Sequence, residues 1–506
     1  MFRHIGWLGL ILLIAGSAAA QTCPLNGTLS PKLVCVIPQV YGPFGFANTS
    51  DPTQSILNTG LHHNAHFSDS FLANVAPINE AVGIQVSQLP IASPSSGITF
   101  VYDPSLKTFA PSTDESLGPI LGDRARTIGP HKLFLGFSYQ YFNYTSLDGQ
   151  SLSSIPIVLQ HMAFPPPFPI PSITSCPNQA GLPSKYAENP CFVRDYVQTS
   201  NNIGLRVNQY TIYATYGITR HLDFSVAIPI IDVRMSVTSQ ATIINNASTP
   251  PGAPGCPGQV WHCFNTIIPA LASQCPTGPV PCTSAKFSTS NSAHGIGDVV
   301  LRGKYNLYNG ERISFAGGVD VRLPSGDELD FLGSGATGVK PFGVVSYRAR
   351  VTPHAEAGYE WNGNSTLAGT NIVAGASATP TDTGKLPNRF IYLVGADFRA
   401  TGRLTVAFDI YGQHLFDSPG LIVQPYTDLG NCHGDPNCGA ATFTAGTTHP
   451  NVGITPSTGL NLTDASIGLK YRIYSKLVLT ANVLIKLDEG GLRSSEVPLV
   501  GVSYNF

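Results

Sequence analysis

The chain has 506 residues, of which only 11% are charged, with 51 glycines, 41 prolines and a formal net charge of -2 at pH 7. It contains no basic patch or stripe that could meet the phosphates of a nucleic acid, so no nucleic-acid partner is expected. Beyond the N-terminus, no uninterrupted apolar run reaches the roughly 20 residues of a membrane-spanning helix. Any crossing of a membrane must therefore be made by strands, and a closed barrel is the strand structure that satisfies its backbone in lipid.

Residues 1–20 have the organisation of a cleaved secretory signal peptide. Arg3 and His4 precede an apolar run that ends at Ala15, and small residues follow up to Ala20. The run is too short for a membrane anchor. Cys23 suggests a lipid anchor as an alternative, but the residues before it are a poor lipoprotein processing site. We therefore expect an exported protein.

Residues 21–128 are expected to form a separate α/β segment. A helix is predicted at Ser68–Gln88, because several apolar residues fall roughly on one side of it: Phe71, Leu72, Val75, Ile78, Val82 and Ile84. The turn sequence Asp103-Pro104-Ser105 predicts a short hairpin of residues 98–102 and 108–110. Two hypotheses remain open: the segment plugs or caps a barrel, or it is a flexible periplasmic extension.

Within residues 129–506 the same pattern recurs: apolar and polar residues alternate over a short stretch, and the alternation is then interrupted. Such alternation indicates strands, and about ten tilted residues span a bilayer. The clear candidates are 133–141, 222–228, 299–307, 313–321, 355–361, 390–398, 404–410, 467–471, 477–485 and 500–506. Two weaker ones are 203–216, whose apolar face changes midway, and 338–348.

The connections between these strands alternate between short and long. Tight turns are predicted at 217–221, 308–311, 349–352, 400–402 and 474–475, and long loops at 145–202, 238–294, 324–339, 363–388, 417–461 and 488–496. This alternation is typical of outer-membrane barrels, which have short periplasmic turns and long extracellular loops. A soluble sandwich gives no reason for it. The fold class expected is all-β, an antiparallel transmembrane barrel of about twelve strands.

The two faces of each predicted strand indicate which side chains contact lipid and which face the lumen. The apolar face is expected outside, because unpaired charges are costly in a dry environment. The lumen-facing candidates are Asp298, Arg302, Lys304, Asp320, Arg322, Glu356, Glu360, Asp397, Arg399, Asp409, Lys470 and Arg472. Each of them either contacts a solute or forms a structural pair, as Asp320 and Arg302 would. About twelve strands is intermediate between filled barrels and open porins, so a narrow or plugged pore is expected.

All 10 cysteines follow the signal peptide. We expect disulfides that staple long loops, with connectivity open, among Cys23, Cys35, Cys176, Cys191, Cys256, Cys263, Cys275, Cys282, Cys432 and Cys438. Zinc binding is the alternative, but the spacing of a zinc site is absent. His62 and His66 could share a metal on a helix, yet no ligand set accompanies them. No metal and no cofactor are therefore expected.

The last residues alternate so that Tyr504 and Phe506 lie on one face of a terminal strand. This ending resembles the assembly signal of bacterial outer-membrane barrels. It implies a location in the outer membrane of a Gram-negative bacterium, with membrane lipid and the barrel-assembly machinery as partners.

Three clusters carry a family resemblance. They are Tyr216-Gly-Ile-Thr-Arg-His-Leu-Asp223, Gly295-Ile-Gly-Asp-Val299 with Leu301-Arg-Gly-Lys-Tyr305, and Leu323-Pro-Ser-Gly-Asp327. Together with Phe506 they resemble the outer-membrane barrel family named for the meta-pathway of phenol degradation, over roughly residues 129–506. The resemblance implies a channel for small, often aromatic or hydrophobic, solutes.

Two classes of function remain open. The first is a passive outer-membrane channel or transporter for such small solutes. The second is a surface-display or adhesion barrel with stapled extracellular loops and a closed lumen. No predicted strand end carries a recognisable Ser–His constellation, so no catalytic residues and no enzyme activity are expected.

Overall fold

A computed structural model describes residues 23–25, 27–46, 55–58, 67–87, 89–90, 100–103, 108–111, 116–161, 194–247, 256–257, 260, 262–369, 372–374, 383–431, 446–474 and 476–506. The predicted signal peptide lies outside the described residues. So do the histidines at 62–66 and the cysteines Cys176, Cys191, Cys432 and Cys438.

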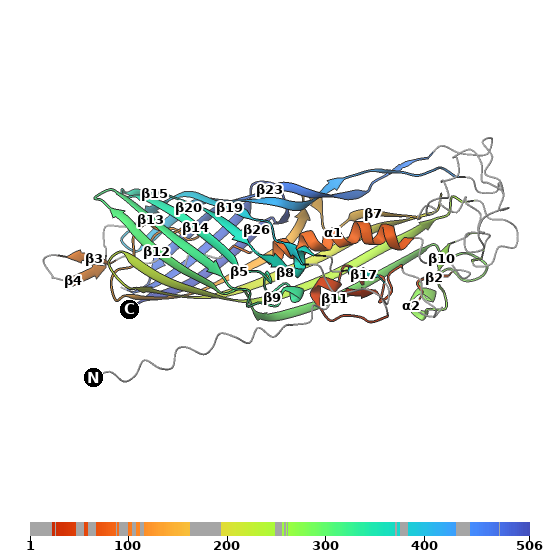
Figure 1. Ribbon diagram of the computed structural model, residues 1–506, viewed down its shortest axis with the longest axis horizontal. Helices are drawn as coiled ribbons and strands as arrows, with labels where there is room; N and C mark the ends of the chain where they lie inside the picture. Colours follow the sequence, from red (N-terminus) through yellow and green to blue (C-terminus); the bar gives the residue numbers. More distant parts are fainter. Residues whose placement is uncertain are drawn as a thin grey trace, which may run out of the picture.

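Twelve antiparallel strands form a closed ring (Figure 1). In chain order they are β5 (Leu133–Leu147), β8 (Tyr196–Gly217), β9 (Leu222–Ile244), β12 (Val300–Asn309), β13 (Ile313–Arg322), β14 (Gly338–Tyr347), β15 (Val351–Asn362), β19 (Arg389–Arg399), β20 (Leu404–Val423), β23 (Val452–Arg472), β24 (Leu477–Lys486) and β26 (Glu496–Asn505). The last strand closes on the first, since Val500 pairs with Tyr139 and the Phe506 N–H donates to the Leu133 carbonyl at 2.8 Å. The predicted fold class is confirmed.

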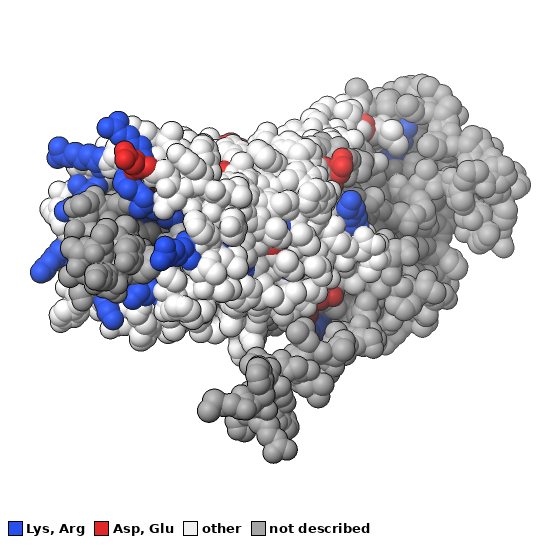
Figure 2. Space-filling view, turned by 60° about the vertical axis from the view of Figure 1, so that its left-hand side comes forward, with Lys and Arg blue, Asp and Glu red and all other residues white. Residues whose placement is uncertain are grey.

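The outer face of the ring is apolar, as the alternation predicts. Side chains such as Ile212, Phe315 and Leu469 are 45–48% exposed on this face. Figure 2 shows a barrel flank almost free of charge, with Lys and Arg gathered at the end that carries the short turns. We call this end the turn end and the opposite one the loop end. Tyr504 and Phe506 are also exposed at the turn end, with ring centroids 4.7 Å apart.

Four strands continue past the ring at the loop end, which corrects three predicted loops. The segments 145–202, 238–294 and 417–461 were expected as loops, yet β8, β9, β20 and β23 run into them. Two further strands, β7 (Ile155–Gln160) and β11 (Ser284–Ile296), pair with β8 and β9 there. The outward residues of β11 are mainly polar. Where the strands extend beyond the lipid, their outer face needs no apolar residues. The alternation of apolar and polar residues therefore stops there, while the backbone pairing between strands continues.

The N-terminal segment contacts both ends of the barrel. At the loop end β1 (Cys23–Leu25) pairs with β17 (Ile372–Ala374), and β2 (Leu57–Asn58) pairs with β10 (Cys263–Phe264). Helix α1 (Ser68–Val86) then lies between β7 and the long strands β20 and β23, all of which it contacts (Figure 1). The hairpin of β3 (Phe100–Asp103) and β4 (Thr108–Pro111) lies beyond the turn end. The helix and the hairpin lie where the sequence predicts them.

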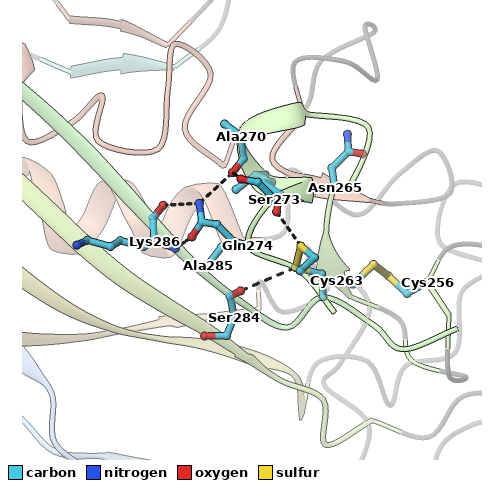
Figure 3. Close-up of a disulfide and its surroundings, with 12 residues drawn as sticks. Cys256, Cys263, Asn265, Ala270, Ser273, Gln274, Ser284, Ala285 and Lys286 are labelled. Carbon is cyan, nitrogen blue, oxygen red and sulfur yellow. Dashed lines mark hydrogen bonds between the residues drawn. A yellow bond between two sulfur atoms is a disulfide. The ribbon is translucent and has the colours of Figure 1, made fainter. Parts of the chain in front are cut away.

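Among the described residues, three disulfides staple the loop end: Cys23–Cys35, Cys256–Cys263 and Cys275–Cys282. Next to the last of these, Gln274 accepts from the Lys286 N–H at 2.7 Å and donates to the Lys286 carbonyl at 3.1 Å (Figure 3). The loop thus docks on β11.

Short elements complete the described residues. They are η1 (Leu33–Cys35), β6 (Gln150–Ser151), α2 (Pro269–Ala272), η5 (Glu328–Asp330), β16 (Asn364–Ser365), η6 (Thr366–Ala368), β18 (Gly384–Lys385), β21 (Tyr426–Thr427), β22 (Thr448–His449) and β25 (Leu492–Ser494). In the part of the chain that is described, no helix has both the length and the apolarity to cross a membrane.

Candidate functional site

Residues 116–128, which we call the strap, lie inside the turn end of the barrel. Lys304 on β12 holds its middle, because the Lys304 Nζ donates to Asp123 Oδ1 at 3.0 Å and to the carbonyls of Arg124 and Arg126 at 2.9 and 3.1 Å. Lys304 is only 1% exposed. Asp223 on β9 accepts from the Ile128 N–H at 3.0 Å. One buried cation therefore holds the strap to the wall.

The start of the strap is held by the opposite wall. Arg124 and Asp397 on β19 form an ion pair of 3.3 Å, and Ser116 donates to the same carboxylate. Lys470 on β23 donates to the carbonyls of Leu117 and Pro119. The strap is thus held to opposite sides of the lumen, largely through charged groups.

Two glycines give the strap its bends. Gly118 has a φ of +84° and Gly129, just after the strap, has a φ of +101°. L-residues with a side chain rarely adopt this region, because Cβ approaches the backbone there. The glycines let the chain turn into the strap and out of it toward β5.

A belt of alternating charges lines one side of the lumen above the strap. Arg302 Nε lies 2.7 Å from Asp320 Oδ1, and Lys340 Nζ lies 2.9 Å from Asp320 Oδ2. Closer to the loop end, Glu360 lies 3.3 Å from Arg322 and 2.7 Å from Arg389. Glu356 lies 3.9 Å from Lys340. The charged belt crosses neighbouring strands from β12 to β19, and its members are Arg302, Asp320, Arg322, Lys340, Glu356, Glu360 and Arg389. The strap joins it through Asp123, 3.2 Å from Arg302.

A chamber with a volume of about 140 Å³ lies beside the charged belt. Next to the belt, apolar residues of β9 and β12 also line the chamber, including Ala227, Ile231 and Val300. Leu121 of the strap lines it on one side, and the residues after α1, among them Leu89, line it on another. The chamber is therefore bordered by charged residues, apolar residues and the two parts of the N-terminal segment.

Helix α1 fills the lumen on the loop side of the chamber. Phe71, Val75 and Ile78 are buried, and Gly83 lies so close to Phe331 that an added Cβ would sit 3.1 Å from its ring. Near its end, Gln85 accepts from the Leu492 N–H. Glu80 on this helix is partly buried, and this desolvation raises its pKa to about 7.

The predicted lumen residues fall into four groups. Arg302, Asp320, Arg322, Glu356, Glu360 and Asp298 line the chamber, whereas Lys304, Asp397 and Lys470 contact the strap. Asp409 is buried beside His354, at 2.7 Å from its Nε2. Arg399 and Arg472 end their strands at the turn end and do not line the chamber. The anticipated pair of Asp320 and Arg302 is present.

Several residues of the site were not singled out from the sequence. Lys340 lies next to Pro341, which blurred its strand, and Arg389 lies at the edge of a predicted loop. Asp123 and Arg124 belong to a stretch rich in Gly and Pro that has no periodicity. The charges in that stretch were the available signal. Among the described residues, no group of three or more His, Cys, Asp or Glu side chains is arranged to hold a metal ion.

The family model described as "Putative MetA-pathway of phenol degradation" matches residues 186–415, slightly less than half of the chain. The expected family resemblance is confirmed. No curated protein matches the chain.

Solved structures of outer-membrane proteins are also similar to this chain. An outer-membrane channel from Pseudomonas putida F1 is 10% identical with a TM-score of 0.37, and the match covers 76% of this chain and 98% of that one. The toluene transporter TbuX of Ralstonia pickettii is 11% identical with a TM-score of 0.30, covering 75% and 90%. A FadL homologue from Pseudomonas aeruginosa is 9% identical with a TM-score of 0.25, covering 74% and 89%.

The protein is located in the bacterial outer membrane. A closed antiparallel barrel with an apolar outer band satisfies its backbone and its side chains in lipid. Short turns face the periplasm in such barrels, so the turn end is the periplasmic end and the loop end is extracellular.

Proposed function

We propose that the protein is a passive outer-membrane channel for small solutes, with hydrophobic and aromatic compounds as the class it favours. The chamber is the observation that carries this proposal. It lies between two closures of one lumen, the strap at the turn end and α1 at the loop end. A solute would pause in the chamber and leave when a closure moves.

The size and the walls of the chamber support this solute class. An apolar cavity of about 150 Å³ in another protein is known to hold benzene, and this chamber measures about 140 Å³. Its apolar wall would cover the face of a ring, while the charged belt offers hydrogen-bonding partners for a hydroxyl group. The description of the matching family, which refers to phenol degradation, agrees with a solute of this size.

The charged belt argues against strong ion selectivity. Every carboxylate of the belt has a cation within 4 Å, as Asp320 has in Arg302 and Lys340. Paired charges of both signs leave little net field along the lumen. We therefore propose that solutes are selected by size and apolar contact, without a chemical step.

The terminal strand supports a second part of the proposal, the route of assembly. Phe506 is exposed beside the seam between β26 and β5, where the barrel-assembly machinery would reach it during closure. Deletion of Phe506 is expected to reduce the amount of heat-modifiable barrel in outer membranes, measured on unboiled gels. An undiminished amount would contradict this role.

Surface binding is the second candidate function. It is favoured by the loop end, where Cys256–Cys263 and Cys275–Cys282 staple loops beside strands that project beyond the ring. In that case the lumen would stay closed, and the stapled loops would bind a partner outside the cell.

Planar-bilayer recording separates the two functions. The purified chain is compared with the double variant Lys304→Met and Phe71→Ala, which weakens both closures. We expect rare openings in the wild type and sustained stepwise conductance in the double variant. A silent double variant that still migrates as a folded barrel on an unboiled gel would contradict the channel and favour surface binding.

A further inference from the structure

The loop end of the barrel has an extended outer face that is polar. Three strands, β8, β9 and β11, continue side by side past the ring there (Figure 1). Their inward side chains, such as Val207 and Val233, are buried, whereas their outward side chains are exposed or half-buried. The proposed passage of a solute through the lumen makes no use of this outer face, so its chemistry needs another explanation.

The outward residues of β8 and β9 change from apolar to polar along each strand. In the apolar part, Ile212 on β8 and Ile230 on β9 are 45% and 40% exposed, as contact with lipid requires. The next outward residue of β8 toward the loop end is Tyr210, whose ring centroid lies 5.1 Å from that of Tyr139 on β5. Tyrosine is enriched where the membrane meets water. This tyrosine pair therefore marks the extracellular boundary of the lipid on this side of the barrel.

Two arginines lie opposite each other beyond this boundary. Arg206 on β8 and Arg234 on β9 are direct cross-strand partners, and both side chains are exposed on the outer face. Arg206 is four residues beyond Tyr210. That separation is about 13 Å along the strand and, at the usual strand tilt, about 10 Å along the membrane normal. The arginine pair thus lies above the lipid boundary, among the headgroups of the outer leaflet.

The pair carries more positive than negative charge. Asp232, 3.3 Å from Arg234, is the one described carboxylate that forms an ion pair with either arginine. Like charges directly opposite on neighbouring strands are destabilising, and an anion between them relieves the repulsion. Guanidinium groups present planar forks of N–H donors that match the oxygens of a phosphate group. The cross-strand pair therefore has the chemistry of a phosphate site.

Amide and hydroxyl groups flank the arginines on both sides. Asn143 on β5 is the other cross-strand partner of Arg206, and Ser292 on β11 is that of Arg234. Ser290 is the next outward residue of β11 toward the loop end, and all three flanking side chains are exposed. Amides and hydroxyls both donate and accept hydrogen bonds. They would suit the hydroxyl groups of a sugar beside the phosphate.

We propose that this outer face binds a phosphorylated glycolipid of the outer leaflet, which is the chemistry of lipopolysaccharide. A phosphate group of the glycolipid bridges Arg206 and Arg234, its sugars contact the flanking amide and hydroxyl groups, and its acyl chains pack on Tyr210 and Ile230. The height of the arginines favours a glycolipid over a phospholipid. A phospholipid headgroup layer is about 5–8 Å thick, so its phosphate would lie below the pair, whereas a glycolipid carries its phosphates on sugars.

Binding of diphosphorylated lipid A to the purified full chain in detergent tests the site, with the bound lipid counted by native mass spectrometry. The double variant Arg206→Gln and Arg234→Gln is compared with Arg403→Gln, which removes an exposed arginine at the turn end. Loss of a charge-assisted contact weakens binding about tenfold, so the double variant should bind at least about tenfold more weakly. Arg403→Gln should bind like the wild type. Each variant is first shown to be a folded barrel by its heat-dependent gel mobility.

Replacement of Asp232 supplies a second readout, a gain of affinity that misfolding could not produce. Asp232→Asn removes the carboxylate that competes with a phosphate for Arg234, so it should tighten lipid A binding several-fold. Lipid A stripped of its phosphates and phosphatidylglycerol should each bind the wild type at least about tenfold more weakly than diphosphorylated lipid A. The proposal is overturned if either of these lipids binds as tightly, if Asp232→Asn weakens binding, or if Arg403→Gln loses as much affinity as the double variant.

Discussion

The two closures of the lumen are held by different forces. Helix α1 packs through buried apolar side chains, with Phe71 in ring contact with Tyr41 and Phe46 at centroid distances of 5.6 and 5.7 Å. The strap is held by Lys304, Lys470 and the pair of Arg124 and Asp397.

The difference indicates which closure is easier to release. Apolar packing is lost gradually as contacts are removed, whereas a buried ion pair becomes strongly unfavourable when one partner is lost. Water can replace the polar partners of the strap but cannot replace the apolar partners of α1. We therefore expect the strap to be the part that moves and α1 to be the fixed part.

The largest effect is expected from Phe71→Ala in α1. Phe71 is 1% exposed, and truncation of a buried phenylalanine costs about 3–5 kcal/mol through lost burial and the cavity left behind. The variant should lose protection of α1 against protease while the strap stays protected. Equal loss at both closures would remove the distinction between them.

Lys304→Met should release the strap. It leaves Asp123 and Asp223 buried near each other without the Lys304 cation, at a cost of about 3 kcal/mol. Trypsin should then cleave after Arg124 and Arg126 with α1 still protected. Lys486→Met is the matched control, because Lys486 pairs with the exposed Glu489, and it should leave cleavage unchanged.

Replacement of both Cys275 and Cys282 by Ser tests whether the loop end is independent of the strap. The bridge spans seven residues in sequence, and loss of so short a loop closure costs about 2 kcal/mol. We expect faster proteolysis of residues 256–283 and unchanged cleavage of the strap. A strap that also becomes sensitive would show that the two ends are coupled.

The smallest effect is expected from Glu80→Gln on α1. Burial raises the pKa of Glu80 from its ordinary value of 4.5 to about 7, so the folded state favours the neutral form. Below pH 4.5 the carboxyl is neutral in folded and unfolded chains and carries no penalty; above pH 7 the penalty is complete. The variant should stabilise α1 at pH 8 and not at pH 4, measured by protease protection at each pH. Equal stabilisation at both pH values would contradict a titrating Glu80.

The membrane-spanning strands could be predicted, because contact with lipid requires an apolar side chain at every second position. Leu404, Val406 and Phe408 repeat every second residue, and they form β20 as expected. In β8 the inner face changes from apolar Leu205 and Val207, which are buried at the loop end, to polar Thr211 nearer the turn end. This change explains the shift of apolar face seen in the sequence.

The strap and its partners could not be predicted in the same way. Asp123 meets Lys304, which is 181 residues away in the chain, so their contact depends on the path of the strap through the barrel. No local pattern encodes that path. The charged belt was predicted in part, since Arg302, Asp320 and Glu360 alternate on clear strands, whereas Lys340 and Arg389 lie where the strand pattern is interrupted.

The central claim is that the strap closes the periplasmic entrance to the chamber. A cysteine introduced as Ala227→Cys, in the chamber wall and 3% exposed, reports on this entrance through its reaction with a charged thiol reagent. We expect slow labelling with the native strap, much faster labelling when Lys304→Met is added, and no acceleration with Lys486→Met. Fast labelling with the native strap, or no acceleration by Lys304→Met, would contradict the claim.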